Sequence, residues 1–547
     1  MASMNPTAQT HTSRSGSSIS SAFRRFNRPA LQLAGYLVLS FLLMLLLTRS
    51  SFLYPYNNWD DSNSYFSMGK SMFHGTLIYR DLFDQKGPYL YFLYGLCSFI
   101  SRTTFLGVFL MEVLWGAVDL YLLWKIMRLY CRSFLSVVLS PVLFSCMCAS
   151  KSFYWGGCAE ELCLPFLLAA LYILLRRIKS APPLPCGSVG SAQTVGIHFT
   201  SREVFLAGLC CGFVFCVKFT LMGFFLAFSI LVILTCRSLR EFFSLAGCFL
   251  AGIILPFLPW ILYFAANGGL DDWYRVYIYT NVFLYSDFGA NSHGAGLGQR
   301  VYDLAKILYW LVLDNLQYFI FILFGILRSL FCRGTSLLEK IAPILLFGCT
   351  FLFIYIGGAH LPYYAFPLTS LSVIGMGSAG ALLEKAGRRL PRRPSGAWKV
   401  AFLLIGMAAS YCIIFRFSWN SAYLRTSRND IFLTRFTEDI NNDRAAGIVD
   451  PDNTTLLNIG CLDCGLYTTA DIYPSCYWFQ TQTLPGDEVS TQQLSYITEG
   501  CTDYIVARDS YPEEIFQQYE LIDNFHQELQ PQSFDYYLFR RKDLTHT

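Results

Sequence analysis

The chain of 547 residues is 54% hydrophobic and 17% aromatic, and only 14% of its residues are charged. An average soluble domain carries about 25% charged residues, so a soluble enzyme built around one core is excluded. The stretches Leu31 to Leu47 and Phe242 to Phe264 carry no charged residue, and each has about the length that crosses a hydrocarbon core of ~30 Å. The sequence therefore predicts a polytopic membrane protein.

The formal net charge of +4 conceals an uneven distribution. From Ser421 onward the chain has 8 Lys and Arg against 20 Asp and Glu, which leaves 33 against 17 before that point. A basic part with long apolar stretches is typical of membrane-facing loops, and the acidic part indicates a separate water-soluble domain. Nucleic-acid binding has little support from this pattern.

Positive residues indicate how the chain is oriented. Arg24, Arg25 and Arg28 precede the first apolar stretch, and positive charge in short segments stays cytoplasmic. Residues 1–30 are therefore predicted to be a cytoplasmic N-terminal tail. No cleavage site closes the following apolar stretch, so 31–48 is predicted to be an uncleaved signal anchor. The expected location is the plasma (inner) membrane.

Eleven apolar stretches are predicted to span the membrane, within a transmembrane module over 31–420. They lie near 31–48, 105–128, 133–150, 158–175, 204–217, 219–236, 242–265, 308–331, 341–357, 362–383 and 400–417. The further apolar segment Pro88 to Ile100 is too short for a span and is expected to lie on the outer membrane surface. Two long loops, 49–101 and 267–306, are then external, and Ala181 to Ser201 is a cytoplasmic linker.

Residues 421–547 are predicted to form a small extracytoplasmic α/β domain. Asp430 to Asn441 has a helical pattern, and 455–459, 504–507 and 536–540 have the pattern of short strands. Four cysteines lie in this part: Cys461, Cys464, Cys476 and Cys501. They permit one or two disulfides, but the sequence does not show which cysteines would pair. The Cys-Leu-Asp-Cys run alone is a weak signal for a metal or redox site.

The first external loop concentrates charge next to the membrane. It carries four acids and two bases: Asp60, Asp61, Asp81, Asp84, Arg80 and Lys86. These charges could simply pair in a solvated loop. However, two adjacent carboxylates beyond a span repel one another, which can raise a pKa toward that of a useful base. Tyr65, Met68 and Met72 recur at helical spacing after them, so a surface helix could hold an aspartate at the membrane face.

A family resemblance is carried by this loop and by three later motifs. The string from Asp61 to Gly69, followed by Gly75 to Pro88, resembles the first external loop of GT-C glycosyltransferases, relatives of protein O-mannosyltransferases and of the lipid A aminoarabinose transferase. Gly156 to Pro165 is similar to the start of a later span in that family, where glycines are followed by acidic residues. The third matching segment is Phe215 to Gly223, which contains Lys218. The fourth, Gly357 to Tyr364, has Tyr-Tyr where many members have His-Tyr.

The resemblance implies a GT-C-like fold and transfer of a sugar from a polyprenyl-phosphate carrier outside the cytoplasm. It places the base that deprotonates the acceptor at Asp61, with Asp60 as the second choice. Cations would neutralise the departing phosphate. The candidates for binding the donor phosphate or sugar are Arg80, Asp81, Asp84, Lys86, Glu160, Glu161, Lys218, Arg275, His360 and Tyr363.

Several of these candidates have simpler explanations. Lys218 at the end of a span could simply extend its amine toward water. Arg275 could simply form an ion pair with Asp271 or Asp272, without a role in donor binding. For the chain as a whole, a transporter or flippase and a non-catalytic assembly subunit are the alternatives. Most acids lie in loops and not in mid-membrane, which favours the enzyme.

The expected partners are a polyprenyl-phosphate-linked sugar, a glycan, lipid or protein acceptor, and the bilayer. The carboxylates could hold a divalent cation, but no dense ligand motif points to a metal, and no other cofactor is indicated. Neither the sugar nor the acceptor can be identified from the sequence.

Overall fold

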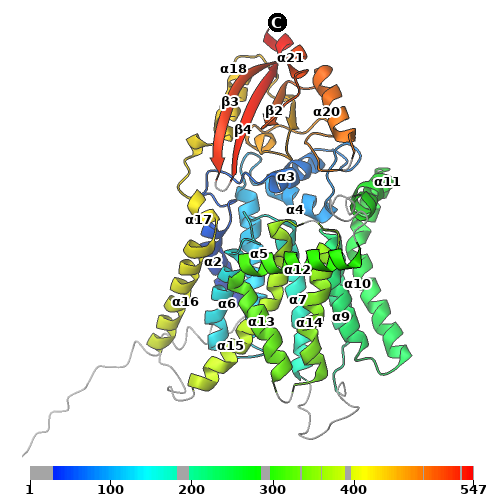
Figure 1. Ribbon diagram of the computed structural model, residues 1–547, viewed down its shortest axis with the longest axis vertical. Helices are drawn as coiled ribbons and strands as arrows, with labels where there is room; N and C mark the ends of the chain where they lie inside the picture. Colours follow the sequence, from blue (N-terminus) through cyan, green and yellow to red (C-terminus); the bar gives the residue numbers. More distant parts are fainter. Residues whose placement is uncertain are drawn as a thin grey trace, which may run out of the picture.

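The computed structural model describes residues 29–180, 196–284, 296–332, 335–358, 360–387, 396–484, 486–529 and 532–545. It is mostly helical: a bundle of long helices carries at one end a domain built on a small sheet (Figure 1). The short helices α3 and α4 lie between the bundle and the sheet (Figure 1). The expected tail 1–30 falls almost entirely outside the described residues, as does much of the expected linker 181–201.

The bundle and its surface helices follow the apolar stretches of the sequence. Their bounds are α2 Pro29–Leu47, α3 Asp60–Phe73, α4 Pro88–Ser98, α5 Leu106–Met127, α6 Ser133–Cys148, α7 Ala159–Ser180, α8 Ser201–Phe215, η1 Phe219–Leu221, α9 Met222–Ile233, α10 Leu239–Ala266, α11 Leu270–Trp273, η2 Tyr274–Leu284, α12 Leu297–Asp314, α13 Leu316–Phe331, α14 Leu337–Tyr355, η4 Pro362–Leu371, α15 Ser372–Ala386 and α16 Gly396–Phe417. Every one of the eleven predicted stretches is helical over most of its length.

The count of eleven spans is not confirmed. By length and composition, five described helical segments can cross a membrane: 106–127, 239–266, 337–355, 362–386 and 398–417. Shorter apolar helices occupy 31–47, 134–148 and 219–233. A multi-pass membrane protein is therefore supported, with five spans by this criterion, or six if one bent pair of helices is counted as a span.

The segment 308–331, predicted as one span, is broken in the structure. The chain bends by 113° between α12 and α13, at Asn315, and α12 runs across the bundle in Figure 1. The amide of Asn315 donates to the carbonyl of Leu311 and accepts from the backbone N–H and hydroxyl of Ser152. These bonds hold the buried asparagine at the corner, where an uninterrupted helix would leave its amide unpaired.

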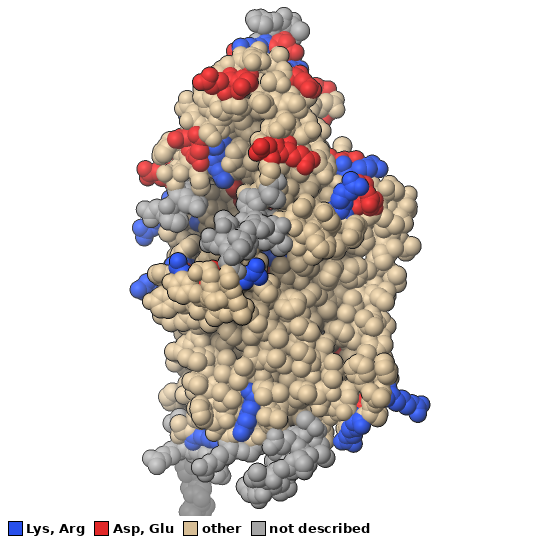
Figure 2. Space-filling model, turned by 45° about the vertical axis from the view of Figure 1, so that its right-hand side comes forward, with Lys and Arg blue, Asp and Glu red and all other residues tan. Residues whose placement is uncertain are grey.

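Charged side chains gather at the two ends of the molecule. In the view of Figure 2, Lys and Arg fringe the end remote from the sheet, Asp and Glu gather around the sheet domain, and the surface between is almost free of charge. The loops that carry the first external motif lie at the same end of the bundle as the sheet domain (Figure 1).

The C-terminal domain has a four-stranded sheet in the order β1-β2-β4-β3. Its strands are β1 Leu456–Ile459, β2 Tyr504–Arg508, β3 Tyr519–Leu529 and β4 Gln532–Arg541; β1 and β2 are parallel and the other pairs antiparallel. Its helices are α17 Asn420–Tyr423, η6 Arg428–Asp430, α18 Phe432–Ala445, α19 Leu466–Thr469, α20 Glu488–Thr498, α21 Ile515–Gln518 and η7 Lys542–Thr545. The predicted helix and three strands are present, whereas β3 was missed. The four cysteines are free thiols.

Candidate active site

The polar helix α3 begins with Asp60 and Asp61 and is buried from Asp61 to Ser71 although it lies outside the bundle. The C-terminal domain covers one side: Ser67 donates to Asp463, and Lys70 pairs with Asp471 at 3.3 Å. On the other side Gly69 packs against α4 so closely that a Cβ would lie 2.4 Å from the carbonyl oxygen of Tyr91. Helix α3 is therefore packed between the C-terminal domain and α4.

The carboxylate of Asp61 has three partners. The phenol of Tyr363 donates to its Oδ2 at 2.9 Å, and the phenol of Tyr65 donates to its Oδ1 at 3.2 Å. The Nζ of Lys86 lies 3.6 Å from Oδ1. Burial raises the pKa of Tyr65 well above its ordinary value, so this phenol stays protonated and remains a donor. Asp61 is thus a fixed carboxylate with a cation beside it.

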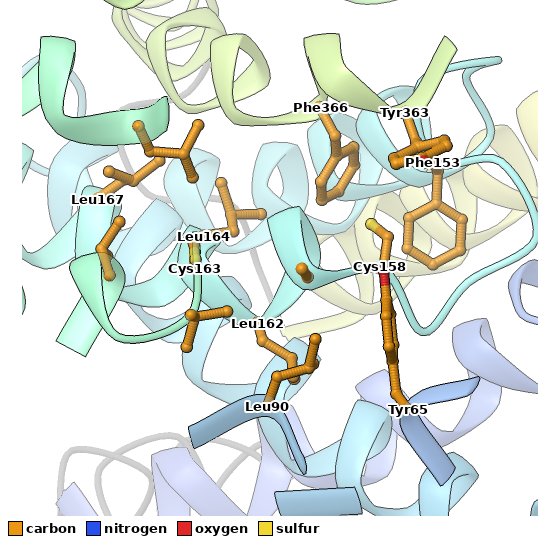
Figure 3. Close-up of a cluster of buried hydrophobic side chains, with 14 of the residues drawn as sticks. Tyr65, Leu90, Phe153, Cys158, Leu162, Cys163, Leu164, Leu167, Tyr363 and Phe366 are labelled. Atoms are coloured by element: carbon orange, nitrogen blue, oxygen red, sulfur yellow. The ribbon is translucent and has the colours of Figure 1, made fainter. Parts of the chain in front are cut away.

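An apolar cluster holds these phenols in place. Figure 3 shows Tyr65 and Tyr363 among buried side chains from the α7 region and from η4, including Cys158, Leu162 and Phe366. Because such a packed interior resists rearrangement, the two hydroxyl groups point at Asp61 from fixed positions.

Lys86 and Lys218 are brought together by their backbones. The N–H of Gly87 donates to the carbonyl of Val217, and the N–H of Tyr89 donates to that of Cys216. A Cβ on Gly87 would lie 2.0 Å from the Cys216 carbonyl oxygen, so only glycine permits this approach. The loop before α4 is therefore fastened to the segment after α8.

Lys218 itself lies in extended backbone between α8 and η1. Its amine pairs with the carboxylate of Glu160 in the first turn of α7 and lies 3.9 Å from the ring centroid of Tyr364. Both members of the ion pair are buried, and a buried pair is costly to break because one charge is left alone.

A cavity of about 250 Å³ connects the two lysines. Its polar lining residues are Lys86, Lys218, Gln85, Asn281, Thr220, Tyr277 and Tyr364. Its apolar wall is formed by Val217, Phe219, Val282, Phe353, Ile354 and Ile356. Two cations and several apolar side chains in one cavity suit a ligand with an anionic head and a hydrocarbon chain.

Three other predicted residues have different surroundings: Asp84 and Glu161 are buried, and Asp60 is half-buried. Asp60 pairs with Arg508 of β2 at 2.8 Å, and burial raises its pKa to about 6 although the guanidinium opposes this. Asp84 accepts from the N–H of Gln85, and burial raises its pKa as well. Glu161 accepts from the N–H of Gly157 at 2.8 Å, which supports the turn before α7 and does not face the cavity.

The remaining predicted residues do not line the cavity of Lys86 and Lys218. Arg80 is exposed and pairs with Asp81 at 2.9 Å. Arg275 is exposed and pairs with Asp271 at 2.7 Å. This ion pair is the simpler explanation of Arg275 that the sequence analysis gave. His360 is exposed and faces the ring of Tyr355. Of the predicted residues, the structure therefore brings together Asp61, Lys86, Lys218, Glu160 and Tyr363.

Other residues of the site did not stand out in the sequence. Tyr79 has a positive φ of 73° and donates to the carbonyl of Lys86 at 2.7 Å. Strained backbone of this kind gathers at functional sites, but a tyrosine gives no sequence signal for it. Arg508 lies 448 residues after Asp60, and only the tertiary structure joins them.

A metal ligand set is absent from the described residues, in which no group of three or more His, Cys, Asp or Glu side chains is arranged to hold an ion. The fold and the site together define a class of protein: a polytopic helical membrane protein with a carboxylate and two lysines beneath a covering domain.

Comparisons with known proteins agree with that class. No protein-family model and no curated protein match the sequence. Among solved structures, ArnT from Cupriavidus metallidurans bound to undecaprenyl phosphate has a TM-score of 0.55 at 13% identity, covering 94% of this chain and 98% of that one. Its apo form has a TM-score of 0.53 at 13% identity, covering 95% and 98%. The resemblance to GT-C glycosyltransferases is confirmed as a likeness of fold.

Proposed function

We propose that the chain is an inverting glycosyltransferase that moves a sugar from a polyprenyl-phosphate carrier to an acceptor hydroxyl at the outer face of the membrane. The observation that carries the proposal is the carboxylate of Asp61 beside Lys86, at a cavity with a second lysine and an apolar wall. The full-length likeness of fold to ArnT, solved with undecaprenyl phosphate, supports a carrier of that type.

The chemistry needs a base and a place for the departing charge. Asp61 takes the proton from the acceptor hydroxyl as its oxygen attacks the anomeric carbon from the side opposite the phosphate. The bond between that carbon and the phosphate oxygen breaks, and its electron pair leaves with the polyprenyl phosphate. Lys86 and Lys218 neutralise the phosphate. The sugar inverts once, because one displacement occurs.

Lys86 and Lys218 are each paired with a carboxylate, Asp61 and Glu160 respectively. The phosphate supplies the negative charge that lets both lysines turn toward the cavity. The apolar wall next to them accepts the first part of the polyprenyl chain, which gains free energy by leaving water.

The test is a transfer assay with purified protein and a panel of polyprenyl-phosphate sugars. Asp61→Asn keeps the size of the side chain but removes the proton acceptor, so turnover is expected to fall by about 10²–10⁴ while donor binding survives. Lys86→Met is expected to weaken donor binding. The control Lys306→Met changes an exposed cation of α12 that does not line the cavity. Near-normal transfer by a folded Asp61→Asn protein would place the base elsewhere.

A further inference from the structure

A second and larger cavity, of about 480 Å³, lies apart from the candidate active site. Its walls are the loop 49–57 after α2, residues 103–106 before α5, and residues 428–437 with Thr469 of the C-terminal domain. The volume is within the range of ligand-binding clefts.

Helix α3 separates this cavity from Asp61. Tyr56, which lines the cavity, donates to Asn63 at 2.8 Å, and Gly465 packs against both side chains. Asn63 follows Asp61 by two residues, so it points to the opposite side of the helix. A ligand in the larger cavity therefore does not reach the proposed base.

The lining of this cavity is positively charged and rich in hydroxyl and amide groups. Arg49 and Arg428 are among the described lining residues, which include no Asp or Glu. Polar side chains that can donate or accept hydrogen bonds surround them: Ser50, Ser51, Thr103, Thr104, Asn429 and Thr434. Hydroxyl and amide groups of this kind bind polyols, and guanidinium groups bind phosphate.

Arg49 is the unusual member of this set. It is 3% exposed, yet no described carboxylate lies within ion-pair distance of it. Its Nε donates to Asn420 at 2.9 Å and its Nη1 donates to Asn58 at 3.1 Å, while the ring centroids of Trp155 and Tyr423 lie 4.0 Å and 4.2 Å from the guanidinium carbon. These contacts supply no counter-charge, and a buried charge without one is costly, so the guanidinium attracts an anion in the adjoining cavity.

The cavity also lies beside the ends of two apolar helices. Arg49 follows the apolar helix α2 by two residues, and Leu106 begins the apolar helix α5. Phe52, Leu53 and Leu106 are exposed there, and large apolar side chains next to the end of a span face acyl chains or head groups. A ligand of this cavity can therefore be attached to the bilayer.

We propose that this cavity binds the phosphate-bearing polyol head group of a membrane lipid, whose acyl chains lie along Phe52 and Leu106. Arg428 and Arg49 attract the phosphate, and the hydroxyl and amide side chains bind the polyol. The proposal is independent of the transfer reaction, because the site is separated from Asp61 and its occupancy is measured by binding.

The experiment follows the melting temperature of delipidated full-length protein in detergent as dioleoylphosphatidylglycerol is added. A ligand that binds only the folded state raises the melting temperature as its sites fill, which gives an apparent affinity. Arg428→Gln removes one charge-assisted contact and is expected to weaken this affinity about tenfold. Thr103→Trp fills the cavity without changing its charge and should have a similar effect. Arg425→Gln, an exposed arginine outside the lining, is the matched control.

Two further probes identify the source of the head group. Dioleoylphosphatidylcholine carries no net charge and no free polyol, and glycerol 1-phosphate carries the head group without acyl chains. The proposal expects a weaker response to both than to phosphatidylglycerol. An equal response to phosphatidylcholine would overturn the charge recognition, and an equal response to glycerol 1-phosphate would overturn the attachment to a lipid. Unchanged affinity in both Arg428→Gln and Thr103→Trp would overturn the site.

Discussion

The guanidinium of Arg508 lies 2.8 Å from the carboxylate of Asp60 and joins the end of β2 to the first turn of α3. The next residue, Asp61, faces Tyr65, Tyr363 and Lys86. Two adjacent carboxylates thus have separate partners: Asp60 joins the C-terminal domain to α3, and Asp61 lies beside Lys86.

The first prediction separates the roles of these two carboxylates. Asp60→Asn is expected to keep transfer within about tenfold of the natural protein, because Asp60 does not face the lysines, whereas Asp61→Asn loses about 10²–10⁴ in turnover. Asp60→Asn instead leaves Arg508 without its partner and is expected to cost about 1–3 kcal/mol of stability. Transfer rates and melting temperatures of both variants check this. A large loss of turnover in Asp60→Asn with normal stability would make Asp60 the base.

The sequence predicted the parts of this site that lie close together in the chain. Apolar stretches indicated the bundle helices, and the spacing of Tyr65, Met68 and Met72 indicated α3, since helical periodicity is a local property. The motif in the first loop contains both Asp61 and Lys86, but only the structure shows that their side chains lie 3.6 Å apart.

What the sequence could not provide are contacts between distant segments. Glu160 and Lys218 are 58 residues apart, and their pairing depends on how α7 packs against the end of α8. The break at Asn315 was missed although Asp314 and Asn315 interrupt the apolar stretch, because the hydrogen bond that holds the asparagine comes from the distant Ser152. Strand β3 was missed because Glu520, Asp523 and Glu528 interrupt its apolar pattern, as is common in an edge strand.

The second prediction concerns the buried pair of Glu160 and Lys218. Glu160→Gln leaves the ammonium buried without a counter-charge and is expected to destabilise the protein by about 3–5 kcal/mol. The double variant Glu160→Gln with Lys218→Met removes both charges and should recover most of that stability. Donor binding should remain weak in the double variant, because the phosphate has lost a cation. Melting temperatures and donor titrations distinguish the two effects. Full donor binding in the stable double variant would show that Lys218 is only structural.

The third prediction tests the backbone contact that places Lys86 beside Lys218. Gly87→Ala puts a methyl group 2.0 Å from the carbonyl oxygen of Cys216, so the loop must move away from α8. We expect donor affinity to fall about tenfold, with a loss of about 1–3 kcal/mol in stability from overpacking. Gly348→Ala in α14 is the control, since nothing lies within 4 Å of its added Cβ. The same donor affinity in both variants would contradict the role given to this contact.

The last prediction uses a pair of carboxyl groups in the C-terminal domain. Asp439 of α18 lies beside Asp523 of β3, and burial together with the neighbouring carboxylate raises the pKa of Asp439 to about 6. Arg435 pairs with Asp523 at 2.5 Å and offsets only part of the repulsion. Because the pKa is higher in the folded state than in the unfolded chain, the folded state binds the proton more tightly. Stability is therefore lost as the pH rises from about 4 to about 6.

Asp439→Asn removes the charge that appears in this pH range. The variant should be more stable than the natural protein at pH 7.5 and nearly equal to it at pH 4.5. Since Asp439 is partly exposed, solvent screening limits the gain to at most about 1 kcal/mol. Hydrogen exchange of peptides from α18 and β3, compared at the same pH, measures the difference locally. The control Glu438→Gln makes the same charge change on an exposed neighbour. Equal hydrogen-exchange protection of Asp439→Asn and the natural protein at pH 7.5 would show that the two carboxylates do not repel each other. The raised pKa of Asp439 instead predicts that protection rises only in Asp439→Asn, and only at the higher pH.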